Sequence, residues 1–270
     1  MSQDSAKLTF DELDAIVVCP HCRAPLPLAE GRDAACRACG AQYAHIAGTW
    51  DLSDVAARDS DPKWQAWDVV QDNGLVAYTE EPIRNLSVGD REDAKEFGTF
   101  CRFEGVTLDV GCGLQDWPAY FYAFDAHARF VGIDPLIARA GPRYWQFRAL
   151  AEHLPFGDGA FDRVLFATSL DHFVRPVDAL REAGRVCARG GHVVLWVAEK
   201  RADAPKPATS PEWYRQLTKP DGADDVFHIE RLNIDKVGRF IEEANLRLVE
   251  RQDKIIDAYR SSHFLRLSPG

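Results

Sequence analysis

The chain has 270 residues, of which 46% are hydrophobic and 27% charged, so pervasive disorder is excluded and there is room for one large and one small domain. Acidic residues outnumber basic ones by 42 to 32, and no run of Lys and Arg offers the positive surface that nucleic acid requires. No apolar stretch approaches the roughly 20 residues of a membrane span, and the first ten residues lack the apolar core of a signal peptide. We therefore expect a cytoplasmic protein without a membrane partner, and we disfavour nucleic acid as a partner without excluding it.

Two C-x-x-C pairs stand near the N-terminus and predict a zinc site. The four residues are Cys19, Cys22, Cys36 and Cys39. Each pair occupies a tight turn that aims two thiolates at one point, and two such turns complete the tetrahedral sulfur shell that Zn²⁺ prefers. A pair of disulfides is the alternative, which a reducing cytoplasm disfavours. His21 and His45 lie nearby, but four thiolates leave no need for them. We predict a structural zinc ribbon over residues 1–55.

The stretch around these cysteines also resembles a known family. Phe10–Cys22 contains a helical pattern that leads into the first cysteine pair, and Tyr43–Leu52 is similar to a closing strand and loop. Leu8 to Leu52 thereby resembles the zinc-ribbon family that includes the small activator protein of eukaryotic tRNA and rRNA methyltransferases. A ribbon of this size has a small core, so we expect it to pack against the rest of the chain.

Residues 56–104 are helical and aromatic in pattern, and we interpret them as a connector that caps the substrate side. Asp72-Asn73-Gly74 is typical of a turn, and Asp90 is a candidate N-cap for a helix over residues 90–101. The aromatic residues Trp64, Trp67 and Tyr78 fit a packed core better than a substrate mouth, although both interpretations stay open.

The centre of the chain has the layout of a nucleotide-binding βαβ unit. A short apolar strand, Val106–Val110, is followed at once by Gly111-Cys112-Gly113, and a second strand, Arg129–Ile133, ends at Asp134. Glycines let the backbone turn sharply and approach a ligand, and an acid at the end of the second strand can accept hydrogen bonds from both ribose hydroxyls. We expect a helix between the two strands.

Further strands and helices alternate and predict an α/β fold with a doubly wound, mostly parallel sheet. The expected strands are 145–150, 161–167 and 191–198, with a helix over 176–189. A helix over 234–244 precedes two runs, 246–251 and 263–267, that we expect to pair as an antiparallel edge.

Residues from about Thr107 to Leu267 resemble the class I S-adenosylmethionine-dependent methyltransferases. The motifs in order are Leu108–Gly113, Gly132–Pro135, Ala151–Phe156, Phe161–Val164 and Glu182–Val186 followed by Gly190-Gly191. The resemblance implies a Rossmann-like, seven-stranded domain over residues 105–270 and a cofactor site. Its expected contacts with S-adenosylmethionine are Asp109, Gly111, Cys112, Gly113, Asp134, Pro135, Ala151, Glu152 and Thr168.

Two positions depart from the family pattern. The glycine turn continues as Leu114-Gln115, where relatives often have another glycine, so bulky groups come close to the cofactor. Leu150 stands where many relatives have an Asp that receives the adenine amino group. That hydrogen bond would have to come from Glu152, a backbone carbonyl or water.

Methyl transfer needs an aligned nucleophile and a place for its proton. His172 follows the fourth strand of the sheet, where the mouth of such a fold opens, so it is our first candidate for a general base. Asp171 is its expected orienting partner or a substrate ligand. His228 is the second candidate; it follows a polar segment that we expect to form a lid over residues 199–230.

Three functions compete at this point. We favour methyl transfer to an oxygen or nitrogen of a small-molecule or saccharide-type acceptor, because the acidic composition is unsuited to polyanionic substrates. An rRNA or tRNA base methyltransferase, with the ribbon recognising RNA, is the alternative. A methyltransferase fold without catalytic activity is the third.

Overall fold

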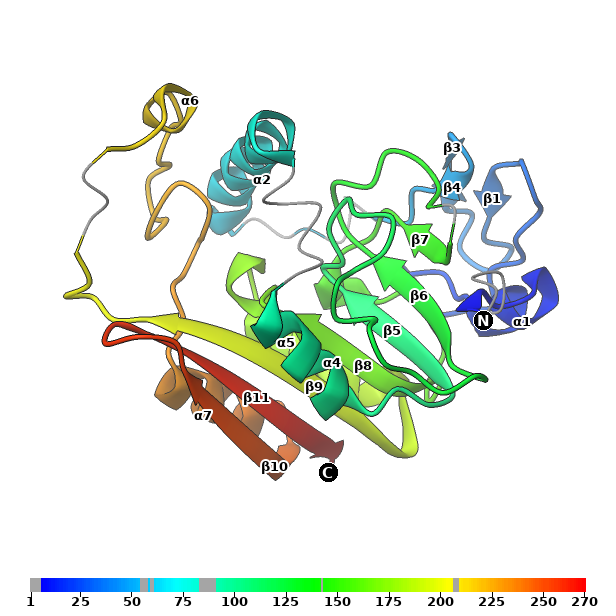
Figure 1. Cartoon of the computed structure of the whole chain (residues 1–270). Helices are drawn as coiled ribbons and strands as arrows, with labels where there is room; N and C mark the ends of the chain where they lie inside the picture. The colour runs from blue at the N-terminus through cyan, green and yellow to red at the C-terminus, as the bar shows by residue number, and fades with distance from the viewer. Residues whose placement is uncertain (1–5, 54–57, 59–60, 83–90, 142, 206–208) are drawn as a thin grey trace.

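The computed structural model describes residues 6–53, 58, 61–82, 91–141, 143–205 and 209–270. Its centre is a seven-stranded sheet with the strand order β10-β11-β9-β8-β5-β6-β7 (Figure 1). The strands are β5 (Val106–Val110), β6 (Arg129–Ile133), β7 (Trp145–Phe147), β8 (Phe161–Ala167), β9 (Cys187–Lys200), β10 (Leu246–Ile255) and β11 (Arg260–Pro269). Five neighbouring strands run parallel, and β11 and β10 add an antiparallel edge. The predicted fold class is confirmed.

Each face of the sheet is covered, and strand alternation explains how. In β8, Val164 and Phe166 point into one apolar core, while Leu165 between them points into a second core on the opposite face. The first core includes side chains of α5 (Pro176–Val186) and α7 (Ile234–Glu243), and the second includes side chains of α4 (Glu92–Cys101). Figure 1 shows α4 in front of the sheet and α7 behind it. This layering leaves the carboxyl ends of the parallel strands to form a site.

The expected helix after the glycine turn is absent from residues 114–128, which form turns and bends instead. Pro118 accounts for part of this difference, because a residue that precedes proline avoids helical angles. The segment packs by its aromatic rings: Trp117 and Phe121 lie against Phe130 of β6, with ring centroids 5.6 and 4.1 Å away. Aromatic packing therefore covers this face where the sequence pattern had predicted a helix.

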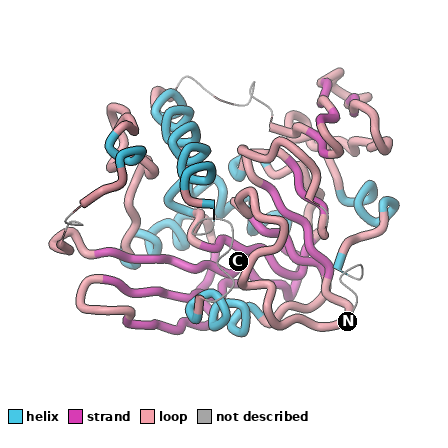
Figure 2. Tube along the Cα trace, turned by 45° about the horizontal axis from the view of Figure 1, so that its top comes forward, coloured by secondary structure: helices cyan, strands magenta, loops and turns pink. Residues whose placement is uncertain are grey.

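The connector contains a long helix, α2 (Lys63–Glu80), and the turn expected at Asp72-Asn73-Gly74 was wrong. Asn73 is buried, and its amide Nδ2 donates hydrogen bonds to the carbonyl oxygens of Thr218 and Val226 at 2.8 and 2.7 Å. These bonds join α2 to the segment that also contains the short helix α6 (Glu212–Arg215). In Figure 2 the two helices lie beside each other. The turn-forming residue thus serves as a buried link between segments.

The second connector helix also begins differently from the prediction. Helix α4 starts at Glu92, and its N-cap residue is Arg91, which makes no side-chain capping bond. Asp90, the expected cap, lies outside the described residues. The apolar face is as expected, since Ala94, Phe97 and Cys101 are all buried.

The N-terminal segment packs against the β7 edge of the sheet. Its helix α1 (Phe10–Ile16) begins with a capping box between Thr9 and Glu12. Two short antiparallel ladders follow: β1 (Ala34–Ala35) pairs with β2 (Gln42–Tyr43), and β3 (His45–Ile46) pairs with β4 (Thr49–Trp50).

The N-terminal segment and the sheet share one continuous core. Trp50 is 1% exposed, and its ring lies 6.1 Å from that of Phe147 in β7. The guanidinium of Arg23 also reaches Glu182 of α5 at 2.7 Å. The expectation that this segment packs against the rest of the chain agrees with these contacts, whereas the three-part domain division stays a prediction.

Other element boundaries differ by a few residues from the sequence patterns. Helix α5 ends at Val186, and β9 begins directly after it and runs to Lys200, longer than expected. Two short 3₁₀ helices, η3 (Ala151–His153) and η4 (Leu170–His172), follow β7 and β8. Within the described part of the chain, we find no helix with the length and apolar character that crossing a membrane demands.

Candidate active site

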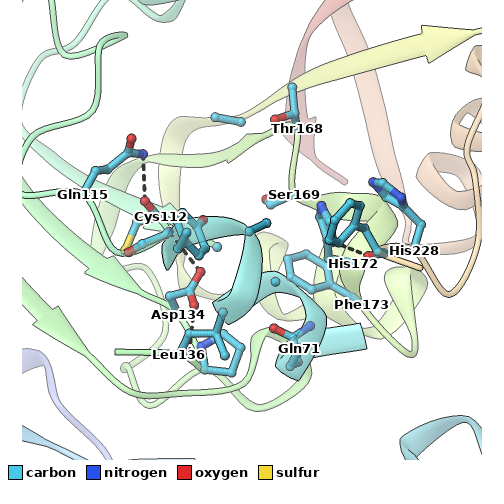
Figure 3. Close-up of a pocket in the computed structure, with 18 of the residues that line it drawn as sticks. Gln71, Cys112, Gln115, Asp134, Leu136, Thr168, Ser169, His172, Phe173 and His228 are labelled. Carbon is cyan, nitrogen blue, oxygen red and sulfur yellow. Dashed lines mark hydrogen bonds between the residues drawn. The ribbon is translucent and has the colours of Figure 1, made fainter. Parts of the chain in front are cut away.

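A cavity of about 370 Å³ opens at the carboxyl ends of β5, β6 and β8. One wall is the glycine turn after β5 together with Asp134 and Pro135 after β6, and a second is Thr168 to Phe173 after β8. Helix α2 supplies the opposite wall through Trp67, Val70, Gln71, Gly74, Ala77 and Tyr78. Phe227 and His228 close a further side. Figure 3 shows the glycine turn and Asp134 at one end of this space and the two histidines at the other.

The glycine turn is shaped by two positive backbone angles. Gly111 and Gly113 have φ of 74° and 69°, which other L-residues rarely adopt. A Cβ at Gly111 would lie 2.6 Å from Cβ of Ser169, and one at Gly113 would lie 2.8 Å from the hydroxyl of Tyr78. Both positions therefore require glycine, because the backbone angle disfavours other residues and because a Cβ would collide with a neighbouring side chain. The backbone of the turn lies open to the cavity.

Asp134 is held by the turn that it faces. Its Oδ2 accepts a hydrogen bond from the N–H of Gly113 at 2.9 Å, and its Oδ1 accepts one from the N–H of Leu136 at 2.9 Å. Burial raises the pKa of Asp134 to about 6, although the two backbone donors act in the opposite direction. Each oxygen keeps a further lone pair, so the carboxylate can accept two hydroxyl donors from the cavity.

Asp109 lies behind the glycine turn, at the penultimate position of β5. Its Oδ2 accepts a hydrogen bond from the hydroxyl of Tyr120 at 2.7 Å. Within the described residues its Oδ1 is buried without a hydrogen-bond partner. Burial raises the pKa of Asp109 to about 7, the Tyr120 hydroxyl lowers it, and the nearby charge of Asp134 raises it further. An unpaired buried carboxylate oxygen is costly, so it marks a place where a cationic or donor group would be stabilised.

These observations fit S-adenosylmethionine. The open backbone turn has room for the amino-acid part of the cofactor, and the two free lone pairs of Asp134 suit the two ribose hydroxyls. Asp109 lies behind this turn and supports it from the side of the core, with one carboxylate oxygen bound by the hydroxyl of Tyr120.

The strand-end turn after β8 carries a strained residue. Thr168 has a φ of 58°, in the left-handed region that β-branched residues avoid. The hydroxyl of the next residue, Ser169, donates to the carbonyl oxygen of Val110 at 2.6 Å and ties this turn to the end of β5. The strained turn directs the following 3₁₀ helix, with His172, into the cavity.

His172, Asp171 and His228 come together at the far end of the cavity. Nε2 of His172 lies 3.8 Å from a carboxylate oxygen of Asp171, and Nε2 of His228 lies 3.5 Å from the other oxygen. The two imidazole rings face each other with centroids 4.5 Å apart. The three predicted catalytic residues therefore form one group, although His228 lies more than 50 positions after Asp171 and His172 in the chain.

Both histidines are oriented through Nδ1. Nδ1 of His172 lies 3.0 Å from the carbonyl oxygen of Phe227, and Nδ1 of His228 lies 2.8 Å from Oδ1 of Asp225. Because both partners are acceptors, each Nδ1 carries a proton, and in the neutral ring the lone pair is on Nε2. Burial lowers the pKa of His172 below its usual value, while the charge of Asp171 opposes this shift.

Two predicted cofactor contacts lie away from the cavity lining. Ala151 and Glu152 are buried in η3, and Oε1 of Glu152 accepts hydrogen bonds from the backbone N–H of Val174 and Arg175 at 3.0 and 3.1 Å. One oxygen of Glu152 therefore holds the segment that enters α5. The other predicted contacts line the cavity, apart from Asp109 behind the turn: Gly111, Cys112, Gly113, Asp134, Pro135 and Thr168.

Several cavity residues lie outside the predicted catalytic and cofactor contacts, although the connector that contains Trp67 and Tyr78 was expected to cap the substrate side. The Nε1 of Trp67 donates to the carbonyl oxygen of His172 at 2.9 Å, and Gln115 donates through Nε2 to the carbonyl oxygen of Cys112 at 2.9 Å. Burial raises the pKa of Tyr78, so its hydroxyl stays protonated beside Asp134. A signal for the α2 wall was present, since its residues recur at helical spacing from position 67 to position 78.

The four N-terminal cysteines form a second group of possible ligands. Their sulfur atoms lie within 4.8 Å of one another, with 3.6 Å between Cys19 and Cys39 and 3.5 Å between Cys22 and Cys36. The hydroxyl of Tyr43 lies 3.0 Å from Sγ of Cys19. Within the described residues, His21 and His45 are not part of this group, and the ring of His45 packs against Trp50 at 4.7 Å.

Comparison with known proteins agrees with the geometry of the main cavity. Residues 108–195 match the family model described as a methyltransferase domain. This part of the chain is similar to methyltransferase domains. The match covers both the glycine turn and the strand-end turn with His172. It supports the prediction of a class I S-adenosylmethionine-dependent methyltransferase, and with it the prediction of an enzyme.

Two curated relatives are named as methyltransferases. The demethylmenaquinone methyltransferase of Lactiplantibacillus plantarum is 30% identical over 125 residues, which are 42% of this chain and 52% of that protein. The chloroplastic tocopherol O-methyltransferase of Arabidopsis thaliana is 25% identical over 169 residues, 57% of this chain and 47% of that protein. The chain thus spans about half the length of the curated relatives it matches.

A solved structure shows the same fold around the methyltransferase domain. The 1,6-didemethyltoxoflavin-N1-methyltransferase of Burkholderia thailandensis, solved with 1,6-didemethyltoxoflavin and S-adenosylhomocysteine bound, has a TM-score of 0.54 and 14% sequence identity. The similarity covers 91% of this chain and 100% of that one. At this identity the comparison establishes the fold.

Proposed function

We propose that the protein transfers the methyl group of S-adenosylmethionine to an oxygen or nitrogen of a small acceptor that lies between the glycine turn and the Asp171/His172/His228 group. One observation carries this proposal: a single cavity joins the cofactor-type turn at one end to a pair of oriented histidines at the other. A bond forms between the acceptor atom and the methyl carbon. The sulfur–methyl bond breaks with its electron pair left on sulfur, and the acceptor's proton leaves toward the histidines.

In this proposal each part of the cavity has its own role. Gly111 to Gly113 and Asp134 hold the cofactor, which supplies an electrophilic methyl group when bound. Thr168 and Ser169 separate the two halves of the cavity, and α2 excludes water above them. His172 is the first candidate to accept the proton, because the hydrogen bond from Nδ1 to Phe227 leaves the lone pair on Nε2.

A small acceptor fits this cavity better than RNA does. The volume of about 370 Å³ is in the range of sites for small molecules, and α2 together with Phe227 and His228 encloses it. The net charge of −10 adds to this argument, since RNA binding depends on positive charge. The names of the relatives point to ring compounds with a hydroxyl or ring nitrogen as the class to examine first.

The four cysteines fit a structural Zn²⁺, which we include in the proposal. In a tetrahedral site with bonds of about 2.3 Å, neighbouring sulfur atoms lie roughly 3.8 Å apart. The distances of 3.5 and 3.6 Å are close to that value. Four thiolates leave no open position for a substrate, so this ion would serve folding.

The proposal is tested with S-adenosylmethionine labelled in its methyl group and a panel of phenolic, quinol and nitrogen-heterocycle acceptors. We expect label transfer to one class. Replacement of His172 by Ala should lower turnover by roughly 10²–10⁴-fold and leave cofactor affinity nearly unchanged. Label transfer to RNA alone, with a steep loss of activity as salt rises, would contradict the small-acceptor proposal.

A further inference from the structure

The Asp171/His172/His228 group has a geometry that a general base does not require. A base needs one lone pair near the acceptor, whereas here two imidazole Nε2 atoms and one carboxylate converge. One ligand atom from each of the three residues lies within 4.8 Å of the others. Three atoms bound about 2.1 Å from one ion would be separated by roughly 3.0–3.4 Å, so small side-chain movements bring the group to bonding distance.

The protonation of the rings also suits a metal. Nδ1 of each ring is paired with an acceptor, so Nε2 is the atom that each ring offers as a metal ligand on the side of the Asp171 carboxylate. Three acceptor atoms therefore face one another. A cation placed among them satisfies all three at once.

The hydrogen bonds that the two histidines make through Nδ1 are of the kind that orients histidine ligands in metal sites. Such ligands usually donate their second ring N–H to a carboxylate or a backbone carbonyl. His228 donates to the carboxylate of Asp225, and His172 donates to the carbonyl of Phe227. Asp225 is held in turn by Nε of Arg231 at 2.6 Å and by the backbone N–H of Phe227 at 2.8 Å.

We propose that Asp171, His172 and His228 bind a divalent first-row transition-metal ion whose open coordination positions face the cavity. Two imidazoles and one carboxylate suit Mn²⁺, Fe²⁺, Co²⁺ or Zn²⁺. Three protein ligands leave positions for water or an acceptor oxygen. Both histidines line the cavity, so an acceptor can reach these positions.

The role of the ion in catalysis rests on the proposed function, whereas its binding does not. An acceptor hydroxyl at the ion has a lowered pKa and loses its proton to water more readily, before the oxygen is methylated. In the metal-loaded protein the ion takes both Nε2 lone pairs and the proton goes to water, so His172 accepts the proton directly only in the metal-free protein. An acceptor with adjacent oxygens, such as a catechol or hydroxyquinone, would occupy two open positions.

Co²⁺ is the probe for this site, added to the protein as isolated while visible absorption is followed. We expect saturable d–d bands of one further Co²⁺ per chain, without the intense near-ultraviolet thiolate absorption of a Cys₄ site. His228→Ala and Asp171→Asn should each weaken Co²⁺ binding at least tenfold. Asp225→Ala removes the outer acceptor of His228 and leaves the three ligands in place, so it should weaken Co²⁺ binding by about tenfold.

Two control variants separate this site from other ligands. His127→Ala changes an exposed histidine far from the cavity and should leave Co²⁺ binding unchanged. Cys36→Ser disrupts the Cys₄ group, and the d–d bands of the second site should persist in it. If wild-type protein shows no saturable binding, or if His228→Ala binds Co²⁺ as tightly as wild type does, the metal proposal is overturned.

A second measurement keeps this result distinct from the proposed methyl transfer. Binding of S-adenosylmethionine is measured by calorimetry without added metal, and label transfer is measured with and without Co²⁺ or Mn²⁺. Cofactor binding and metal-independent turnover with no Co²⁺ site would retain the methyltransferase and exclude the ion. Co²⁺ binding without any cofactor binding would retain the ion and contradict the proposed function.

Discussion

The indole Nε1 of Trp67 donates a hydrogen bond to the carbonyl oxygen of His172 at 2.9 Å. This bond joins α2 of the connector to the turn after β8, across the top of the cavity. It positions the backbone of the residue whose side chain faces Asp171. The connector is therefore part of the active-site structure.

Replacement of Trp67 by Phe removes this hydrogen bond and keeps an aromatic ring. We expect a loss of about 1 kcal/mol in the free energy of unfolding and a several-fold lower kcat with unchanged cofactor affinity. Trp145→Phe is a matched control, because Nε1 of Trp145 donates to the carbonyl oxygen of Leu8 at 2.8 Å, away from the cavity. The control should lose similar stability and keep its kcat. Equal kinetic effects in both variants would argue against a specific role for Trp67.

Asp134→Ala tests the cofactor site. The substitution removes both acceptors for the ribose and frees the N–H groups of Gly113 and Leu136. We expect the binding free energy of S-adenosylmethionine to weaken by roughly 2 kcal/mol or more in titration calorimetry. Asp134→Asn keeps one carbonyl oxygen and should weaken binding less. Affinity equal to wild type in Asp134→Ala would place the ribose elsewhere.

Asp109 gives the stability of the protein a defined pH dependence. Its pKa is raised to about 7 in the folded protein, mainly by burial, from an unfolded value near 4. The folded state therefore binds the proton more tightly, so this residue favours folding below about pH 4 and loses that contribution as pH rises through 7.

Asp109→Asn tests this dependence, because it removes the titration while its amide oxygen can still accept from Tyr120. We expect wild type to lose stability relative to Asp109→Asn between pH 4 and pH 8, followed by denaturant unfolding at several pH values. A constant difference between the two proteins over this range would show that the pKa of Asp109 is not raised.

Cys36→Ser tests the role of the N-terminal cysteines. Loss of one thiolate should release zinc and lower the melting temperature of the whole protein, because Trp50 and Phe147 belong to one core. Metal content and thermal unfolding are measured on the same samples. Cys187→Ser is the control, since this cysteine lies outside the group of four. A preparation without metal but with unchanged melting behaviour would refute a structural zinc.

The parts of the site that the sequence predicts correctly are local. The glycine turn and Asp134 sit at the ends of two strands whose pairing follows from their apolar runs, so their meeting is implied by the topology of a parallel sheet. His172 is similar, because it directly follows β8. In each case the site residue lies within a few positions of the end of a strand, so the strand fixes where the residue is placed.

The features of the fold and the site that the sequence patterns do not predict depend on packing between segments that are distant in the chain. Trp67 and Tyr78 reach the cavity because α2 lies across the strand ends; the sequence predicts a connector on the substrate side but leaves open whether these rings pack in the core or face the cavity. Asn73 was misread as a turn residue because its preference for turns is outweighed by two buried hydrogen bonds. Residues 114–128 packed through aromatic rings, which a helical motif does not anticipate.

The amide of Asn73 also bears on how molecules enter and leave. One side-chain nitrogen holds the carbonyl oxygens of Thr218 and Val226, so α2 cannot swing outward alone without breaking both bonds. Any opening that moves α2 therefore carries residues 218–226, and with them Phe227 and His228, away from the strand ends. Exchange of product for a new acceptor by that route displaces two walls together, a kind of motion that limits the turnover rate in many enzymes.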